Sequence, residues 1–254
     1  MRAYSGHIFR LERHLDRLFR SAKVMGIDLD SIDYDMEEVL HATLEANGLA
    51  DARLRLTVSG GEGDASPDLA GSEAPTALVV AGRFMAPSVQ EGLRAAVSSI
   101  RRNSSSPLSR VKSLNYLDNL LARREAKMGG VDEAILLNEE GVVAEGSTSN
   151  LFLVSQGNLI TPDEGSGILP GITRQVIMGL ASDIGVKTQE SKVTLDELFQ
   201  SDEAFLTNSV IEIVPLVQVD GRTIGSGIAG ETTQVLMRAY TQMVQNEIWG
   251  HKVL

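Results

Sequence analysis

The sequence predicts an α+β fold in two domains. Helical periodicity and strand-like alternation both occur in the first and second halves of the 254-residue chain, and the second half is richer in strands. Residues 85–91, which include Pro87, indicate a linker between the halves. We therefore expect a small α+β domain over residues 1–84 and a larger domain over residues 92–254.

The first domain begins with two predicted helices. Residues 11–25 carry apolar side chains at helical spacing with arginines on another face, and residues 35–47 form a second amphipathic pattern. Alternating residues 53–59 predict a strand. Residues 61–75 are rich in Gly, Ser, Asp and Pro, which predicts a surface loop, and the apolar run 76–82 predicts a buried strand.

The second domain is expected to begin with a strand at residues 93–100, a serine-rich loop at 103–107 and a helix at 114–127. The strands at 142–145 and 150–154 are expected to continue an antiparallel meander. In chain order, the remaining predicted elements are strands at 133–137 and 159–161, a helix at 171–184, strands at 203–208 and 212–219 followed by a hairpin signal at Asp220-Gly221, and a terminal helix at 229–247.

The composition argues against several classes of function. A formal net charge of −11 disfavours nucleic acid and anionic membranes as partners, because both attract basic surfaces. The absence of cysteine rules out disulfides and thiolate metal sites, and the four separated histidines lack the spacing of zinc ligands. With no long apolar run and no apolar signal core, the sequence predicts a cytoplasmic protein.

Lys112 and Glu145 are the first candidates for chemistry. Lys112 precedes apolar residues from Leu114 to Leu121, so we expect desolvation to favour its nucleophilic amine form. Glu145 lies in Glu-Gly-Ser-Thr-Ser-Asn, whose small residues suit a backbone packed against a flat ring. An imine-forming lysine and a carboxylate that keeps a ring nitrogen protonated are what pyridoxal phosphate chemistry requires. Solvent-exposed surface roles are the alternative for both residues.

Two further segments could bind an anion. Gly171-Ile172-Thr173 stands at the start of a predicted helix, where free N–H groups and a hydroxyl favour phosphate. Thr207-Asn208-Ser209 lies between two apolar strand segments and could hold a phosphate or a carboxylate. The alternatives are an ordinary Pro-Gly turn and an ordinary polar turn.

Together and in this order, these segments resemble the class IV aminotransferases. That family of pyridoxal 5'-phosphate enzymes includes branched-chain aminotransferases, D-amino acid aminotransferases and aminodeoxychorismate lyases. The resemblance extends from residues 9–18 to Asp220-Gly221. It implies the two-domain, fold type IV architecture of D-amino acid aminotransferase, a pyridoxal phosphate cofactor, amino acid and 2-oxo acid substrates, and a homodimer.

The resemblance also implies roles for individual residues. Lys112 matches the Schiff-base lysine, which also carries the proton between substrate and cofactor, and Glu145 matches the partner of the pyridinium nitrogen. Tyr116 matches a neighbour of the ring oxygen. The residues that match phosphate ligands are Arg17, Ile172, Thr173 and Ser209. Arg55 and Arg53, on the small-domain strand that faces the substrate in this family, match a clamp for a substrate carboxylate.

The start of the chain departs from the family pattern. Met1-Arg2-Ala3-Tyr4 falls where a Gly-x-Phe-Glu-x-hydrophobic-Arg pattern ends in other members. We therefore expect an N-terminally truncated chain whose small domain lacks some strands. A folded remnant with weak or no activity is one alternative to a working enzyme.

Three readings of the function remain open. Transamination is favoured slightly, because most of the family transaminates. Lys-Ser-Leu-Asn at residues 112–115 and Thr-Asn-Ser at 207–209 also suit aminodeoxychorismate lyases, which release pyruvate and 4-aminobenzoate. Gly225–Gly230 matches the Gly-x-Gly-x-x-Gly pattern of dinucleotide-binding enzymes, but too few residues follow for the required second strand and acidic residue.

Overall fold

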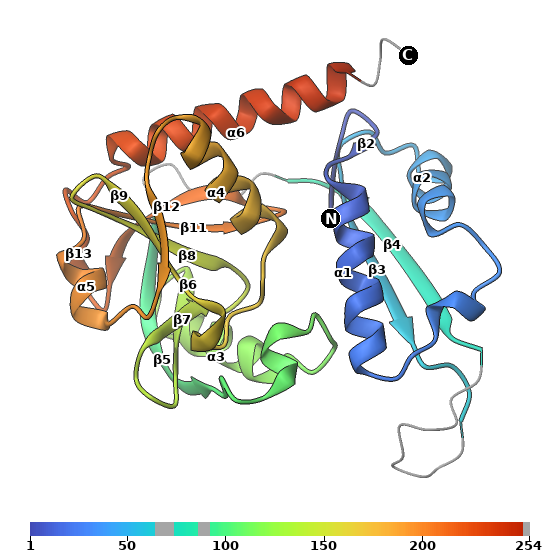
Figure 1. Cartoon of the computed structure of the whole chain (residues 1–254), viewed down its shortest axis with the longest axis horizontal. Coiled ribbons are helices and arrows are strands. Elements are labelled where there is room, and N and C mark those ends of the chain that lie inside the picture. Colours follow the sequence, from blue (N-terminus) through green and yellow to red (C-terminus); the bar gives the residue numbers. More distant parts are fainter. Residues whose placement is uncertain (64–73, 86–91, 251–254) are drawn as a thin grey trace. The chain divides into compact units, whose positions relative to one another are not determined.

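The computed structural model describes residues 1–63, 74–85 and 92–250 and divides the chain into two compact units (Figure 1). The first unit comprises Met1–Ala86 with Val244–Leu254, and the second comprises Pro87–Met243. The sequence assigned residues 244–254 to the larger domain. They group with the first unit instead, because Glu247 accepts a hydrogen bond from the Arg10 main-chain N–H (3.1 Å) and lies 3.2 Å from the Arg10 Nε.

Parts of the predicted loop and linker, residues 64–73 and 86–91, lie outside the described residues. Within the described ranges, no helix is both long enough and apolar enough to cross a membrane.

The first unit is a four-stranded antiparallel sheet with helices on one face. In sheet order its strands are β2 (His7–Ile8), β1 (Arg2–Tyr4), β3 (Ala52–Ser59) and β4 (Thr76–Arg83). Its helices are α1 (Leu11–Val24), the 3-10 turn η1 (Leu29–Ser31) and α2 (Met36–Ala46). Side chains from α1, α2 and β3 form one core that includes Leu11, Leu40 and Leu54.

The outer face of this small sheet carries exposed side chains. Strand β4 was predicted to be buried, but Leu78 is 57 % and Val80 is 45 % exposed. Because the helices cover only one face, alternate residues of β3 and β4 point away from the core. The predictions for α1, α2, β3 and β4 are confirmed to within one residue at each end.

The second unit contains a nine-stranded mixed sheet that curls around its core (Figure 1). The strands pair in the order β10-β9-β8-β11-β12-β5-β6-β7, and β13 pairs with β12. Their bounds are β5 (Leu93–Arg102), β6 (Glu133–Asn138), β7 (Val143–Gly146), β8 (Asn150–Ser155), β9 (Asn158–Pro162), β10 (Thr188–Ser191), β11 (Glu203–Asn208), β12 (Glu212–Val219) and β13 (Arg222–Thr223). The apolar core inside this sheet includes Ile135, Leu151, Leu206 and Leu216, all at most 1 % exposed.

Helices and single turns complete the second unit. They are η2 (Pro107–Arg110), α3 (Leu117–Met128), η3 (Glu164–Ser166), α4 (Ile172–Asp183), α5 (Leu195–Gln200) and α6 (Glu231–Gly250). Helix α3 packs against β5 and β6, and α4 packs against β10 and β11. Helix α5 begins with a capping box in which Thr194 and Glu197 bind each other's main chain.

Two predictions for this unit are wrong. The expected meander does not form, because β7 pairs with β6 while β8 pairs with β9 and β11. The chain changes direction between β7 and β8 in the turn at residues 147–149. Helix α3 begins at Leu117 rather than residue 114, because residues 111–116 are irregular and the Ser113 hydroxyl accepts the Asn115 N–H (3.2 Å).

Candidate functional site

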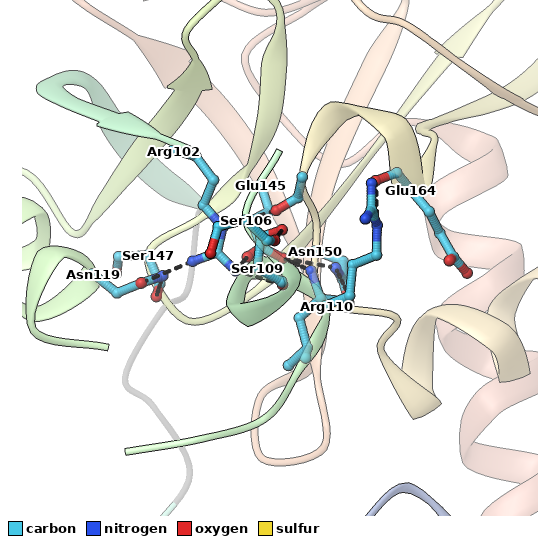
Figure 2. A network of polar contacts seen from close by, with 11 residues as sticks. Arg102, Ser106, Ser109, Arg110, Asn119, Glu145, Ser147, Asn150 and Glu164 are labelled. Carbon is cyan, nitrogen blue, oxygen red and sulfur yellow. Dashed lines mark hydrogen bonds and ion pairs between the residues drawn. The ribbon is translucent and has the colours of Figure 1, made fainter. Parts of the chain in front are cut away.

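Glu145 is a buried carboxylate held by three donors. Its side chain, on β7, is 6 % exposed. Oε1 lies 3.2 Å from Nη2 of Arg102, while Oε2 accepts hydrogen bonds from Asn150 Nδ2 (3.1 Å) and the Leu169 main-chain N–H (3.0 Å). Figure 2 shows Arg102 and Asn150 converging on this carboxylate. Such a network fixes its position and orientation.

The environment of Glu145 places its titration close to neutrality. Burial raises the pKa of the carboxyl to about 7, against opposing effects from Arg102, the Leu169 N–H, Lys112 and Arg174. The carboxyl is therefore poised between its two forms. A ligand that presents a cationic N–H group to it would favour the carboxylate.

The turn that follows Glu145 is packed against a second buried carboxylate. The Gly146 N–H donates to the Ser149 carbonyl (2.7 Å), and the Ser147 N–H donates to the Ala134 carbonyl (2.9 Å). The hydroxyls of Ser147 and Ser149 both donate to Glu133. A Cβ atom at Gly146 would overlap the Ser149 hydroxyl. The small residues therefore allow this turn to close tightly.

Lys112 lies in the irregular segment between η2 and α3, and its side chain is exposed. The prediction that apolar residues surround it is wrong. Leu114 is 63 % and Leu117 is 65 % exposed, because α3 starts later and turns these side chains outward. The Lys112 ammonium nevertheless lies close enough to Glu145 to lower the pKa of that carboxyl. Tyr116 is the residue before α3 and is 36 % exposed.

The start of α4 offers main-chain N–H groups next to two hydroxyls. Gly171 is the N-cap residue, and no side chain caps the helix there. Oγ1 of Thr173 lies 3.5 Å from Oγ of Ser209, so both hydroxyls reach one small volume. A Cβ atom at Gly171 would overlap Oδ1 of Asn150, whose amide also binds Glu145. Ile172, Thr173 and Ser209 are therefore brought together, as predicted.

Asn208 has a local structural role beside this cluster. Its Oδ1 accepts the N–H groups of Val210 (2.8 Å) and Ile211 (2.9 Å), and its Nδ2 donates to the Thr148 carbonyl (2.9 Å). These bonds shape the turn that presents Ser209 and attach it to the turn after Glu145. The neighbouring Thr207 hydroxyl donates to the Glu212 carbonyl (2.5 Å).

Arg17, Arg53 and Arg55 belong to the first unit and are described within it. Arg17 is half-buried on α1, where burial and the neighbouring Arg20 lower its pKa to about 10. It still carries its charge at neutral pH. Arg53 and Arg55 lie on the exposed face of β3, and Arg55 pairs in register with Val80 on β4.

Glycines 225–230 have a structural explanation that involves no nucleotide. A Cβ atom at Gly225 would overlap the Asp202 carbonyl, and one at Gly230 would overlap the Glu203 side chain. The Glu203 carboxylate accepts the N–H groups of Thr232 (3.0 Å) and Thr233 (2.8 Å). The start of α6 is thus already capped by a carboxylate of the protein itself.

Sequence reasoning did not identify Arg102, Asn119, Asn150 or Leu169 as parts of this site. Arg102 ends β5, and its local sequence resembles that of an ordinary exposed strand end. Asn150 was assigned only to a strand. None of the four stands in a local pattern that indicates its contact with Glu145, because that contact arises from tertiary structure.

The described donors fit a particular kind of ligand. A buried carboxylate suits a protonated ring nitrogen, an uncapped helix start with two hydroxyls suits a phosphate, and an accessible lysine suits a carbonyl carbon. Pyridoxal 5'-phosphate combines all three groups. The residues of the second unit therefore fit this cofactor.

Comparisons with known proteins agree with this chemistry. The family model described as amino-transferase class IV matches residues 1–219. A branched-chain-amino-acid aminotransferase of Pseudomonas aeruginosa is 37 % identical, over 96 % of this chain and 81 % of its own length. An aminodeoxychorismate lyase of Bacillus subtilis is 35 % identical, over 97 % and 85 %.

A solved structure has the same fold. A branched-chain amino acid aminotransferase from the organism abbreviated T.th., complexed with N-(5'-phosphopyridoxyl)-L-glutamate, superposes with a TM-score of 0.87 at 33 % identity. The match covers 95 % of this chain and 82 % of that one.

Proposed function

We infer that Lys112 and Glu145 are the reactive pair of this chain, which belongs to the class IV aminotransferase family of pyridoxal 5'-phosphate enzymes. It is an enzyme of the aminotransferase type, and aminodeoxychorismate lyases occur in the same family. One observation carries the assignment of the pair. Three donors hold the buried Glu145 carboxylate, and the Lys112 ammonium is within its electrostatic reach.

Pyridoxal phosphate, when bound, supplies an aldehyde that links to amines and a ring that takes up the electron pair left by a departing α-proton. Lys112 supplies the amine for attachment and moves the proton at the substrate Cα. Glu145 accepts the N–H of the ring nitrogen and keeps that nitrogen protonated. Arg102, Asn150 and the Leu169 N–H keep the carboxylate facing one way while the charge around it changes.

The remaining residues bind and orient. The N–H groups at Ile172 and Thr173, with the hydroxyls of Thr173 and Ser209, are proposed to bind the phosphate. Arg17 is proposed as a further phosphate ligand and Tyr116 as a neighbour of the ring oxygen. Arg55, and with it Arg53, is proposed to bind a substrate carboxylate; their exposed guanidinium groups support this role.

The proposed reaction moves an amino group from an amino acid to a 2-oxo acid. Branched-chain amino acids are the proposed donors, because the Pseudomonas aeruginosa relative is named for them. The second candidate is aminodeoxychorismate lyase activity, which the Bacillus subtilis relative supports over nearly the whole chain. Both reactions use the same lysine and carboxylate, and they differ after the α-proton has left.

Half-reaction spectroscopy on the cofactor-loaded protein separates these candidates. L-leucine, L-isoleucine, D-alanine and aminodeoxychorismate are each mixed with the enzyme without a 2-oxo acid. For a branched-chain transaminase, L-leucine converts the cofactor absorbance in one turnover and releases the matching 2-oxo acid. Pyruvate and 4-aminobenzoate from aminodeoxychorismate would instead establish the lyase. No spectral change with any substrate would contradict both.

We also propose that the enzyme works as a homodimer. Helix α3 exposes an apolar row in which Leu117 is 65 %, Leu120 is 43 % and Met128 is 78 % exposed. An apolar surface of this kind is typical of a protein–protein contact. Light scattering should give twice the chain mass for the wild type and a smaller mass for Leu117→Arg. A wild-type monomer at all concentrations would reject the dimer.

A cytoplasmic location is proposed as well. The chain contains no cysteine, so a reducing compartment costs it no disulfide. Fractionation of cells that express the protein would test this location, and recovery outside the cytoplasmic fraction would contradict it.

A further inference from the structure

Arg102 occupies the centre of the polar network around Glu145. Its side chain is 15 % exposed. Nε donates to the Gly167 carbonyl (2.8 Å), Nη1 to Asn119 Oδ1 (2.9 Å) and Nη2 to the Ser109 carbonyl (2.8 Å), while Nη2 also lies 3.2 Å from Glu145. Figure 2 shows this guanidinium between Asn119 on one side and Glu145 on the other. A planar fork of five N–H donors can satisfy all four partners at once.

The partners of Arg102 lie on the segments that carry the proposed site. Ser109 is three residues before Lys112, in η2, and Asn119 is in the first turn of α3, which follows Lys112. Gly167 stands two residues before Leu169, whose N–H binds Glu145. One guanidinium therefore links the lysine segment from both sides to the carboxylate and to the chain leading into α4.

Arg102 is also the cation best suited to act on Glu145. Burial raises the pKa of Glu145, and Arg102 opposes this more than the Leu169 N–H, Lys112 or Arg174 does. Lys112 must be neutral to react, so its charge is not constant. Arg174 is paired with Glu190 at 2.7 Å. Arg102 keeps its charge throughout, because a guanidinium does not lose its proton in proteins.

We propose that Arg102 is a positioning residue for the reaction: it holds Glu145 in its ionised form and fixes the Lys112 segment relative to that carboxylate. Arg102 acts through Glu145 and through main-chain carbonyls, not by touching the substrate. The proposal rests on the proposed function for its catalytic meaning. Its physical content can be measured whether or not the transaminase assignment holds.

The first test measures the titration of Glu145 in the full-length protein, with and without pyridoxal phosphate. Carbon-13 NMR of labelled glutamate gives this signal, identified by its absence in Glu145→Gln. In Arg102→Met, the acid dissociation constant of Glu145 should fall at least about tenfold, which corresponds to one pKa unit. Arg102→Lys, which keeps the charge, should recover most of this change. An unchanged constant in folded Arg102→Met would overturn the proposal.

Arg110→Met is the matched control. Arg110 lies in the same region, but its guanidinium donates to the carbonyls of Glu164 (3.3 Å) and Ser104 (3.5 Å). If any arginine lost here shifted the titration by disturbing the fold, Arg110→Met would reproduce the effect. The proposal predicts that it leaves the Glu145 constant unchanged, and a shift equal to that of Arg102→Met would contradict it.

A second measurement does not depend on whether Arg102→Met folds. In the wild type, nitrogen-15 signals of the Arg102 guanidinium should move with pH at the same midpoint as the Glu145 carbon signal. In Glu145→Gln this movement should vanish. Guanidinium signals that do not respond to Glu145, or that respond equally in Glu145→Gln, would show that the two groups are not coupled. Failure of the substrate reactions with intact coupling would count against the proposed function alone.

Discussion

The main-chain N–H of Leu169 donates to Oε2 of Glu145 at 3.0 Å, which ties the carboxylate directly to the segment leading into α4. Asn150 reinforces the tie, because its Nδ2 binds both Glu145 (3.1 Å) and the Leu169 carbonyl (2.9 Å). A group bound at the start of α4 and a group bound at Glu145 are therefore held at a fixed separation. This is what a rigid cofactor with a phosphate and a ring nitrogen requires.

Replacing Glu145 by glutamine should slow the removal of the α-proton while the cofactor stays bound. The shape of the side chain is kept, but the charge that holds the ring nitrogen protonated is lost. We expect a fall of about 100- to 1000-fold, or about 3 to 4 kcal/mol of barrier. Single-turnover absorbance with L-leucine measures it, and Glu164→Gln, at an exposed position in η3, is the control. A wild-type rate would reject the role of Glu145.

Removing the hydroxyls beside α4 should weaken the binding of phosphate in particular. Thr173→Val and Ser209→Ala each delete one donor, worth about 1 kcal/mol, so pyridoxal phosphate affinity should fall about fivefold in each. Binding of pyridoxal, which lacks the phosphate, should not change. Thr188→Val is the control, because the Thr188 hydroxyl has no hydrogen-bond partner among the described residues. Equal losses for both ligands would place the phosphate elsewhere.

The stability of the cofactor-free protein should fall as pH rises from about 4.5 to 7. Glu145 titrates near 4.5 when unfolded and near a pKa of about 7 when folded, so the folded state binds more protons across this window. The loss should be on the order of 3 kcal/mol. Urea unfolding at several pH values measures it against Glu145→Gln. Parallel pH profiles for the two proteins would show that burial does not raise the pKa of Glu145.

Acid should loosen the serine-rich loop that leads to Lys112. Glu139 accepts the Ser104 N–H (2.9 Å) and hydroxyl (2.9 Å), and these bonds lower its pKa to about 2. The stabilisation is complete above pH 4.5 and is lost as pH falls toward 2. Hydrogen exchange at Ser104 should therefore accelerate in this range, and Glu139→Gln should exchange fast at every pH. Acid-independent exchange in the wild type would contradict the contact.

Local patterns in the sequence predict most elements because each pattern has a local cause. Helix α2 begins where the Asp35 carboxylate accepts the N–H groups of Glu37 (2.7 Å) and Glu38 (3.4 Å). Strands β11 and β12 match their predicted residues at both ends. The order of strands in the large sheet was not predictable in this way, because β8 finds its partners in β9 and β11 rather than in the preceding β7.

The site was predictable only in part for the same reason. Glu145, Thr173 and Ser209 stand in short motifs of small or polar residues, and the structure gathers Thr173 with Ser209. Arg102 lies far from Glu145 in the sequence, and nothing near it indicates that partner. The surroundings of Lys112 were misjudged because helical periodicity identifies an apolar face without showing whether the protein covers that face.

Peptide mapping of the cofactor-loaded protein after borohydride reduction tests the central claim most directly. Reduction makes a linkage between the cofactor carbonyl and a lysine amine permanent, and mass spectrometry identifies the lysine. The account predicts the phosphopyridoxyl group on Lys112 in the wild type and in the exposed-site control Lys187→Ala, and no labelled peptide in Lys112→Ala. A label on another lysine of the wild-type protein, or no label at all, would contradict it.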